Sequence, residues 1–242
     1  MSKTVYHQAN TRGHVNHGWL NAHHSFSFAS WQDRTRMHFG VLRVLNDDEI
    51  AGKMGFGMHP HDNMEIITIP LVGELVHKDS MGNSAIISAG QIQVMSAGTG
   101  ITHSEFNNTN DTLKLLQIWV FPKLQNVIPR YDELTLNETD RVNKFQQILS
   151  PNEKDAGVWI HQDAWFSLGK FDKNRKESYT VKKQNNGVYV FVISGSASIN
   201  EQVINTRDGF GIWDTTSFDI SILNDHTEIL LMDVPMELPN HH

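Results

Sequence analysis

Two short stretches carry the most informative pattern in the chain: Gly57-Met-His-Pro-His-Asp-Asn-Met-Glu65 and Gly98-Thr-Gly-Ile-Thr-His-Ser-Glu-Phe106. In an extended strand, alternate residues face the same side. The first stretch therefore aims His59 and His61 at one point, and the second does the same with His103 and Glu105. The chain between them is long enough for a hairpin path out and back. We therefore predict that the four side chains converge inside one small β-barrel.

Three imidazoles and one carboxylate suit a borderline transition metal, namely Fe, Mn, Co, Ni, Cu or Zn, better than Ca or Mg. Around an octahedral ion, four protein ligands leave two positions open for O₂ or a chelating substrate. A closed structural zinc site would more often contain cysteine. A lone histidine on a strand is more often a hydrogen-bonding residue than a ligand, but two paired motifs at this spacing favour a metal site.

The rest of the first half has the sequence pattern of a β protein. Short apolar runs are separated by Gly, Asn and Asp, and helical periodicity is scarce, which indicates a sandwich or a barrel. The predicted strands are 41–45, 65–69, 75–77, 85–87, 91–95 and 113–120. Pro60 lies between the two paired histidines, and a proline within a strand predicts an edge strand or the mouth of a barrel.

The second half repeats this plan. Four features recur in the same order: an apolar strand that ends at a glycine, the strand after it, a strand that follows a glycine, and a strand that ends at a proline. The matched ranges are 66–73 with 187–195, 74–78 with 196–200, 90–94 with 209–213, and 115–122 with 228–235. The spacing shortens along the chain, as expected for two copies of one β-module with shorter loops in the second. The join is predicted between 129 and 157, where turn-forming residues gather.

The composition excludes several classes of function. The chain has 242 residues, a formal net charge of −7 and no long Lys/Arg run, which argues against nucleic acid as the main partner. It has no cysteine, so disulfides, thiolate metal sites and cysteine nucleophiles are excluded. We see no signal-peptide core and no membrane-spanning apolar run, and we expect a cytoplasmic protein. Of the 14 histidines, His241 and His242 are set aside, because terminal histidines can be remnants of a tag.

The histidine motifs resemble those of a known superfamily. The segment His59-Pro-His61 with Glu65, and the later His103-Ser-Glu105, are similar to the metal motifs of cupins. They resemble still more closely those of pirin-like proteins, the bicupins that include bacterial quercetin 2,3-dioxygenases. The resemblance covers most of the chain, through the segments 24–28, 39–47, 79–83, 93–98, 149–151 and 160–163.

The resemblance implies an all-β fold of two tandem cupin barrels, each a double-stranded β-helix or jelly roll. Residues 1–130 would form an N-terminal barrel that holds one divalent metal, Fe(II) by analogy. Its ligands would be His59, His61, His103 and Glu105.

Residues 131–242 would form a C-terminal barrel without metal ligands. This half has no H-x-H motif and no counterpart of the later G-x-x-H-x-E motif. Its inward positions are expected to be apolar or aromatic, as at Val190, Val192 and Trp213. The second barrel would then be a structural partner of the first.

The resemblance also implies an activity. An enzyme of quercetin 2,3-dioxygenase type would bind a flavonol through its 3-hydroxyl and carbonyl oxygens, with Glu105 as the base that accepts the hydroxyl proton before O₂ opens the heterocycle. Many cupins use the glutamate at the position of Glu65 instead, so Glu65 is an alternate ligand or a partner that orients an imidazole. The alternative function is a non-catalytic regulator, in which the metal senses redox state and the chain binds a protein partner.

A few further residues lie near these motifs. Trp19, Trp31 and Trp119 could form an aromatic wall for a substrate, although a place in the core is the more common role of tryptophan. Phe56, beside the histidines, could contact substrate or form a hydrophobic collar. His77 and Asp79 lie where a strand passes into a turn, and we expect both at the surface.

Overall fold

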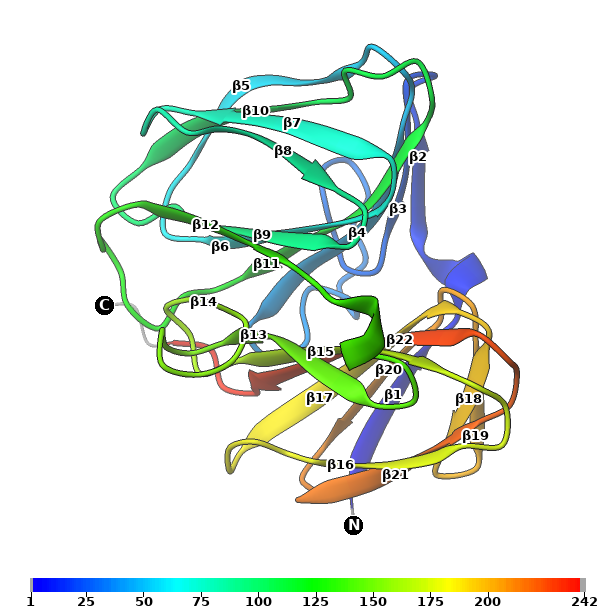
Figure 1. Ribbon diagram of the computed structural model, residues 1–242. Helices are drawn as coiled ribbons and strands as arrows, with labels where there is room; N and C mark the ends of the chain where they lie inside the picture. The colour runs from blue at the N-terminus through cyan, green and yellow to red at the C-terminus, as the bar shows by residue number, and fades with distance from the viewer. Residues whose placement is uncertain (1, 240–242) are drawn as a thin grey trace.

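The computed structural model describes residues 2–239, and His241 and His242 lie outside that range. Within it, the chain forms β-strands and two short 3-10 helices, η1 (Ala9–Thr11) and η2 (Glu138–Asp140). The predicted all-β fold is confirmed. Figure 1 shows two barrels, with the first half of the chain mainly in the upper one. No helix among the described residues is long and apolar enough to cross a membrane.

The first barrel contains eleven strands. They are β2 (Gly13–Asn16), β3 (Leu20–His24), β4 (Leu42–Ile50), β5 (Gly55–His61), β6 (Glu65–Val72), β7 (Glu74–Asp79), β8 (Ser84–Ser88), β9 (Gln91–Ser96), β10 (Ile101–Phe106), β11 (Leu113–Val120) and β12 (Arg130–Thr135). The larger sheet has the order β12-β9-β6-β11-β4-β3-β2, and the smaller has the order β5-β10-β7-β8. All strands predicted in the first half are therefore present.

The second barrel also contains eleven strands. They are β1 (Lys3–His7), β13 (Phe145–Ser150), β14 (Val158–Trp159), β15 (Trp165–Phe171), β16 (Lys176–Thr180), β17 (Asn186–Ser194), β18 (Ser196–Ile199), β19 (Gln202–Asn205), β20 (Gly209–Trp213), β21 (Ser217–Ile222) and β22 (Thr227–Pro235). Its sheets have the orders β1-β20-β17-β22-β15-β13-β14 and β16-β21-β18-β19. Apart from the outermost strand β14, which pairs parallel with β13 whereas β2 pairs antiparallel with β3, this is the arrangement of the first barrel, so the predicted duplication is confirmed.

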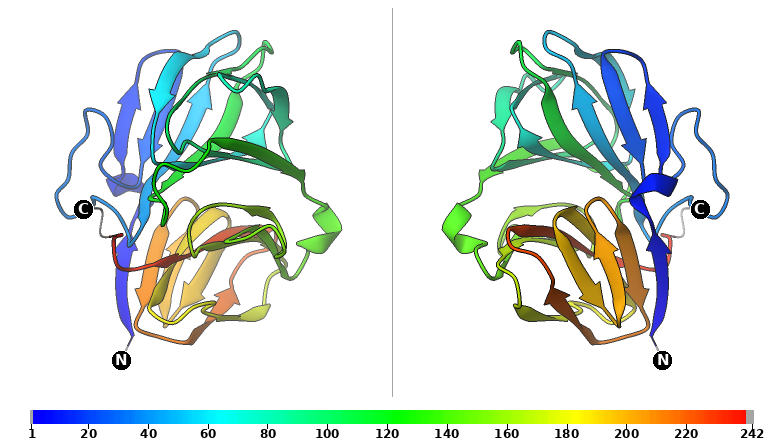
Figure 2. Two further views of the ribbon diagram at one scale, coloured as in Figure 1. Left: turned by 90° about the vertical axis from the view of Figure 1, so that its left-hand side faces the viewer. Right: turned by 90° about the vertical axis from the view of Figure 1, so that its right-hand side faces the viewer.

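Each barrel takes one edge strand from the segment that precedes the other barrel. β1 comes before the strands of the first barrel but pairs with β20, and β12 comes before those of the second but pairs with β9. Figure 2 shows the blue N-terminal strand beside the lower barrel. A division at residue 130 would therefore separate β1 from its partner β20 and β12 from its partner β9. Sequence order assigns a segment to its neighbour in the chain, whereas an edge strand joins whichever sheet has unpaired backbone groups.

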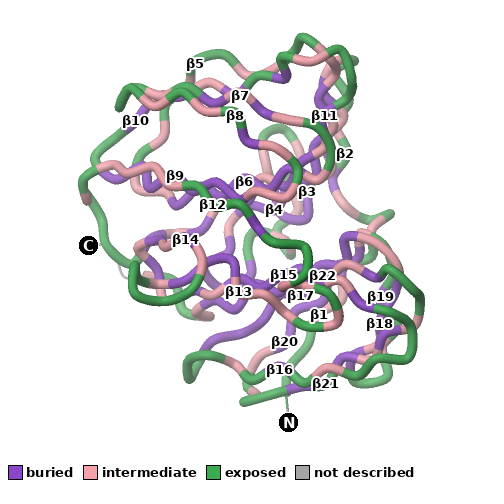
Figure 3. Tube along the Cα trace, in the orientation of Figure 1, coloured by how far each residue is buried: buried purple, intermediate pink, exposed green. Residues whose placement is uncertain are grey.

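The two larger sheets face each other and share the largest hydrophobic core. Strand alternation sends Ile67 and Ile69 of β6 into this shared core, whereas Ile66 faces the inside of the first barrel. On β17, Phe191 and Ile193 join the shared core from the other side. Figure 3 shows buried chain concentrated where the barrels meet. The first barrel is thus supported from outside by the shared core, while two smaller apolar clusters occupy part of its interior.

Apolar side chains fill the interior of the second barrel. Val190 and Val192 belong to this core, as predicted. The prediction for Trp213 is wrong, because Phe210 and Ile212 are the inward residues of β20, and Trp213 packs against the shared core instead. A step of one residue along a strand moves a side chain to the opposite face.

Candidate metal centre

β5 and β10 bring the predicted histidines together in the smaller sheet of the first barrel. His103 lies directly opposite His59. Along β5, His59 and His61 are half-buried, whereas Met58 and Pro60 are exposed, so the alternation predicted from the sequence is present. β5 is the edge strand of its sheet, as Pro60 predicts.

A β-bulge next to the histidines shapes the site. The pairing of β5 with β10 slips, so that Glu105 lies opposite Phe56 and two residues of β5 face Ser104 alone. The Gly57 carbonyl, inside the bulge, accepts a hydrogen bond of 2.8 Å from Nδ1 of His59. Donation from Nδ1 leaves Nε2 as the nitrogen with a free lone pair, so the bulge sets both the ring orientation and the ligating atom.

The three imidazoles form a compact triad. Ligating nitrogens of His59, His61 and His103 lie within 4.8 Å of one another, and the ring centroids are 4.4 to 5.0 Å apart. His103 is buried, and neither of its ring nitrogens has a hydrogen-bond partner among the described residues. A buried nitrogen without a partner is costly unless something else satisfies it. The donor set and these free nitrogens fit a transition metal ion.

The electrostatics of the triad favour the ligating form of histidine. Burial, reinforced by the charge of His59, lowers the pKa of His61 to about 4. Burial and the charges of His59 and His61 lower the pKa of His103 to about 3. Both rings are therefore neutral at pH 7, as a metal ligand must be.

Glu105 lies beside the triad, but its carboxylate is turned toward β11. Its two oxygens accept hydrogen bonds from Nε2 of Gln117 at 3.1 and 2.9 Å, and Oε1 also accepts one from Thr68 Oγ1 at 3.4 Å. Burial raises the Glu105 pKa. The carboxylate is not part of the cluster of converging ligand atoms. The structure thus brings together three of the four predicted ligands, and Glu105 as the fourth stays a prediction.

Glu65 faces away from the histidines, so its predicted role as alternate ligand or imidazole partner is wrong. β5 ends at His61, and Asn63 adopts a φ of 43° before β6 begins, so the alternation of β5 does not continue into β6. Glu65 Oε2 accepts a hydrogen bond of 2.6 Å from Ser96 Oγ, and the nearby backbone amide of His161, in the second barrel, partly offsets the burial that raises the Glu65 pKa. Glu65 therefore faces the second barrel.

The expectation that His77 and Asp79 lie at the surface is also wrong. β7 pairs with β10 so that His77 lies opposite Glu105 and Asp79 opposite His103, which turns both inward. Both side chains are fully buried, and Nε2 of His77 lies 3.2 Å from Oδ2 of Asp79. The His77 ring centroid is 5.4 Å from that of His103. These two residues therefore lie next to His103 on the inner face of the smaller sheet.

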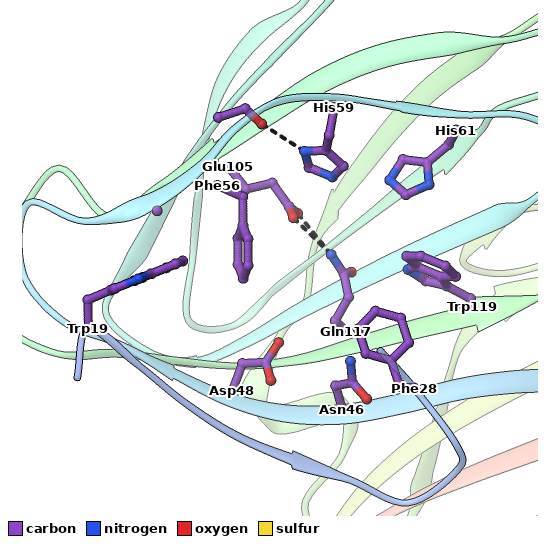
Figure 4. A pocket seen from close by; sticks show the side chains of 12 residues that line it. Trp19, Phe28, Asn46, Asp48, Phe56, His59, His61, Glu105, Gln117 and Trp119 are labelled. Carbon is purple, nitrogen blue, oxygen red and sulfur yellow. Dashed lines mark hydrogen bonds between the residues drawn. The ribbon is translucent and has the colours of Figure 1, made fainter. Parts of the chain in front are cut away.

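His59 and His61 of the triad line a cavity of about 400 Å³ with aromatic walls, to which Trp31 does not contribute. Trp19 and Phe56 meet edge to face at 5.2 Å, and Phe28 and Trp119 do so at 5.3 Å. The Trp119 ring also lies 4.9 Å from the ring of His61. Figure 4 shows these aromatic side chains around the space in front of the histidines. The cavity therefore suits a flat aromatic molecule, one end of which would reach a metal ion held by the histidines.

Sequence reasoning missed four residues that line this cavity, namely Phe28, Asn46, Asp48 and Gln117. The signal for the polar ones is present in the sequence. Asn46 and Asp48 occupy alternate positions of β4, and Gln117 interrupts the apolar run of β11. A polar residue at an inward position of an otherwise apolar strand indicates a lined cavity.

Two cupin barrels, of which one presents three converging histidines beside an aromatic cavity, define a bicupin with one candidate metal centre among residues 2–239. Residues 5–120 match the family model of pirin, and residues 147–234 match that of the quercetinase C-terminal cupin domain. The chain belongs to the pirin family.

Its relatives include proteins named for an enzymatic activity. Quercetin 2,3-dioxygenase of Escherichia coli strain K12 is 42% identical over 229 residues, which cover 94% of this chain and 97% of that protein. The crystal structure of YhhW from Escherichia coli superposes with a TM-score of 0.91 at 40% identity and covers 99% of this chain and 100% of that one. The bacterial pirin YhhW in complex with nickel(II) has a TM-score of 0.90 at 39% identity, with coverages of 96% and 99%.

Proposed function

We propose that this protein is a metal-dependent dioxygenase of quercetin 2,3-dioxygenase type that uses Fe(II) to open a flavonol with O₂. The observation that carries the proposal is the geometry of the site: three imidazoles converge beside a cavity walled by aromatic rings. The name of the Escherichia coli relative supports the reaction class, and the nickel(II) complex of YhhW supports a first-row metal.

His59, His61 and His103 would hold the ion, with Glu105 as the proposed fourth ligand. When bound, the metal supplies a Lewis acid that lowers the pKa of a coordinated hydroxyl. The backbone carbonyl of Gly57 keeps Nε2 of His59 directed at the site. The edge contact with Trp119 limits rotation of the His61 ring.

Glu105 is also the proposed base. Its raised pKa makes the carboxylate a better proton acceptor than an exposed glutamate, and an oxygen of this side chain would take the proton of the flavonol 3-hydroxyl. Gln117 holds both oxygens in the resting site, so it would position the carboxylate before transfer. The rings of Trp19, Phe56 and Phe28 would hold the flat substrate and exclude water.

Oxygen consumption with quercetin tests the proposal. The metal-free protein is loaded in turn with Fe(II), Mn(II), Co(II), Ni(II), Cu(II) and Zn(II), and O₂ uptake and loss of the quercetin absorbance are followed together. The proposal expects turnover that needs a metal and that His103→Ala abolishes. If quercetin and metal bind but no metal supports turnover, the dioxygenase function is wrong. A metal-binding regulatory protein that binds a protein partner is then the function to test.

A further inference from the structure

We propose that Asp48 is a specificity-determining residue of this cavity, whose carboxyl hydrogen-bonds a polar group at the end of the substrate remote from the metal. The inference rests on the proposed function and narrows its substrate class. The substrate would be a flavonol with a hydroxyl on an outer ring, in addition to the 3-hydroxyl and carbonyl that reach the metal.

Asp48 and the histidines stand on opposite walls of the barrel. Asp48 belongs to β4 in the larger sheet, whereas His59 and His61 belong to β5 in the smaller one. Figure 4 shows the Asp48 carboxyl directed into the cavity, across from the His59 ring. Packed sheets lie roughly 10 Å apart, so a molecule that touches both groups must be elongated, as a fused or linked ring system is.

The carboxyl of Asp48 forms no hydrogen bond or ion pair with the described residues. Its cross-strand neighbours are Leu115 on β11 and Ala22 on β3, and neither side chain can form a hydrogen bond. Oδ1 is buried without a partner among residues 2–239. The other two polar side chains of this wall are already engaged, because Asn46 is hydrogen-bonded to His24 and Gln117 to Glu105.

Burial without a partner makes the neutral form the resting state. Burial, and then the nearby charges of Asp47 and Glu105, raise the pKa of Asp48 to about 8. A neutral carboxyl offers one O–H donor and an acceptor oxygen, and a phenolic hydroxyl can satisfy both. Leaving such a group unpaired in an apolar wall costs free energy that a bound hydroxyl would recover. The cavity therefore discriminates in favour of a ligand that carries one.

Three variants separate this role from a structural one. Asp48→Leu removes the hydrogen-bonding group and keeps the same branching of side-chain heavy atoms, and Asp48→Asn keeps a neutral hydrogen-bonding group. Gln93→Leu is the matched control, since Gln93 is also buried in this barrel with an unpartnered oxygen but does not line the cavity. Binding of 3-hydroxyflavone, 3,7-dihydroxyflavone and 3,4′-dihydroxyflavone is measured by titration, with each protein in its metal-free and its nickel(II)-loaded form. Thermal unfolding checks that every variant is folded.

The wild-type protein should bind at least one dihydroxyflavone about tenfold or more tightly than 3-hydroxyflavone, with or without metal, as expected for one buried hydrogen bond. Asp48→Leu should bring this ratio close to one, whereas Asp48→Asn and Gln93→Leu should retain most of it. The inference about Asp48 is overturned if Asp48→Leu leaves the ratio unchanged, if the wild type shows no preference, or if Asp48→Leu does not fold. Each of these outcomes leaves the proposed function standing. If the wild type binds no flavonol at all, the proposed function is overturned with it.

Discussion

The two barrels have the same strand order in their sheets, but the first encloses a cavity with histidines and the second an apolar core. Where β5 and β10 set His59 opposite His103, the corresponding β16 and β21 set Tyr179 opposite Phe218, inside a continuous apolar core. The same contrast runs along the neighbouring strands of the larger sheets. Thr68 on β6 has a polar hydroxyl directed at Glu105, whereas β17 places valines at its inward positions.

This difference shows how one fold can divide stability and chemistry between two copies. The second barrel is filled, and its larger sheet also contributes half of the shared core. The first barrel rests on that core from outside, which allows its interior to keep a cavity, free histidine nitrogens and the unpartnered Asp48 oxygen. Polar groups of this kind lower stability, and proteins retain them where they serve function.

The largest expected effect tests whether metal binding belongs to the first barrel alone. His61→Ala removes one of three converging ligands and should lose nearly all nickel(II), whereas His17→Ala, an exposed histidine away from the triad, should lose none. Metal content is measured by elemental analysis after gel filtration. Both variants keep His241 and His242, so any nickel bound by these two residues contributes equally to both measurements and does not affect the difference. Equal metal content in the two proteins would show that the site lies elsewhere.

The next prediction compares the cost of removing a large side chain from each barrel. Phe218→Ala opens a void in the filled core and should lower the free energy of unfolding by about 3–5 kcal/mol. Phe56→Ala, at the edge of a cavity that already exists, should lower it by about 1–2 kcal/mol. Chemical denaturation of the metal-free proteins gives both values. Similar costs would mean that the first barrel is packed as tightly as the second.

Much of this contrast could be predicted from the sequence, because it depends on short-range patterns. Alternation along β5 and β10 placed the histidines, and the recurring glycine and proline positions revealed the second copy. The exchange of β1 and β12 could not be predicted in this way. Which sheet edge accepts a strand depends on backbone groups that lie far apart in the sequence.

The site shows the same limit in more detail. Alternation is reliable within one strand, but it does not continue across the break at Asn63, so the pattern of β5 cannot predict which way Glu65 faces. The bulge that turns Phe56 inward depends on the register between two strands, and the burial of His77 depends on its partner on β10. Each of these features requires knowledge of a cross-strand neighbour.

The smallest expected effect concerns the contact between the barrels at Glu65. Burial raises the pKa of Glu65 to about 7, from an ordinary value of 4.5. Between these two pH values, the folded protein keeps a proton that the unfolded chain has released. The Glu65 contribution to stability is therefore complete below pH 4.5 and is lost as the pH rises through about 7, with a slope of at most about 1.4 kcal/mol per pH unit.

Glu65→Gln should remove this part of the pH dependence, because glutamine does not titrate and its amide oxygen can still accept the hydrogen bond from Ser96. The measurement is the free energy of unfolding of the metal-free proteins at a series of pH values from 4.5 to 8. Glu153→Gln, at an exposed position, provides the control for the loss of one acidic side chain. If wild type and Glu65→Gln give parallel curves, Glu65 is charged in the folded protein, and the contact between the barrels is not sensitive to pH at this residue.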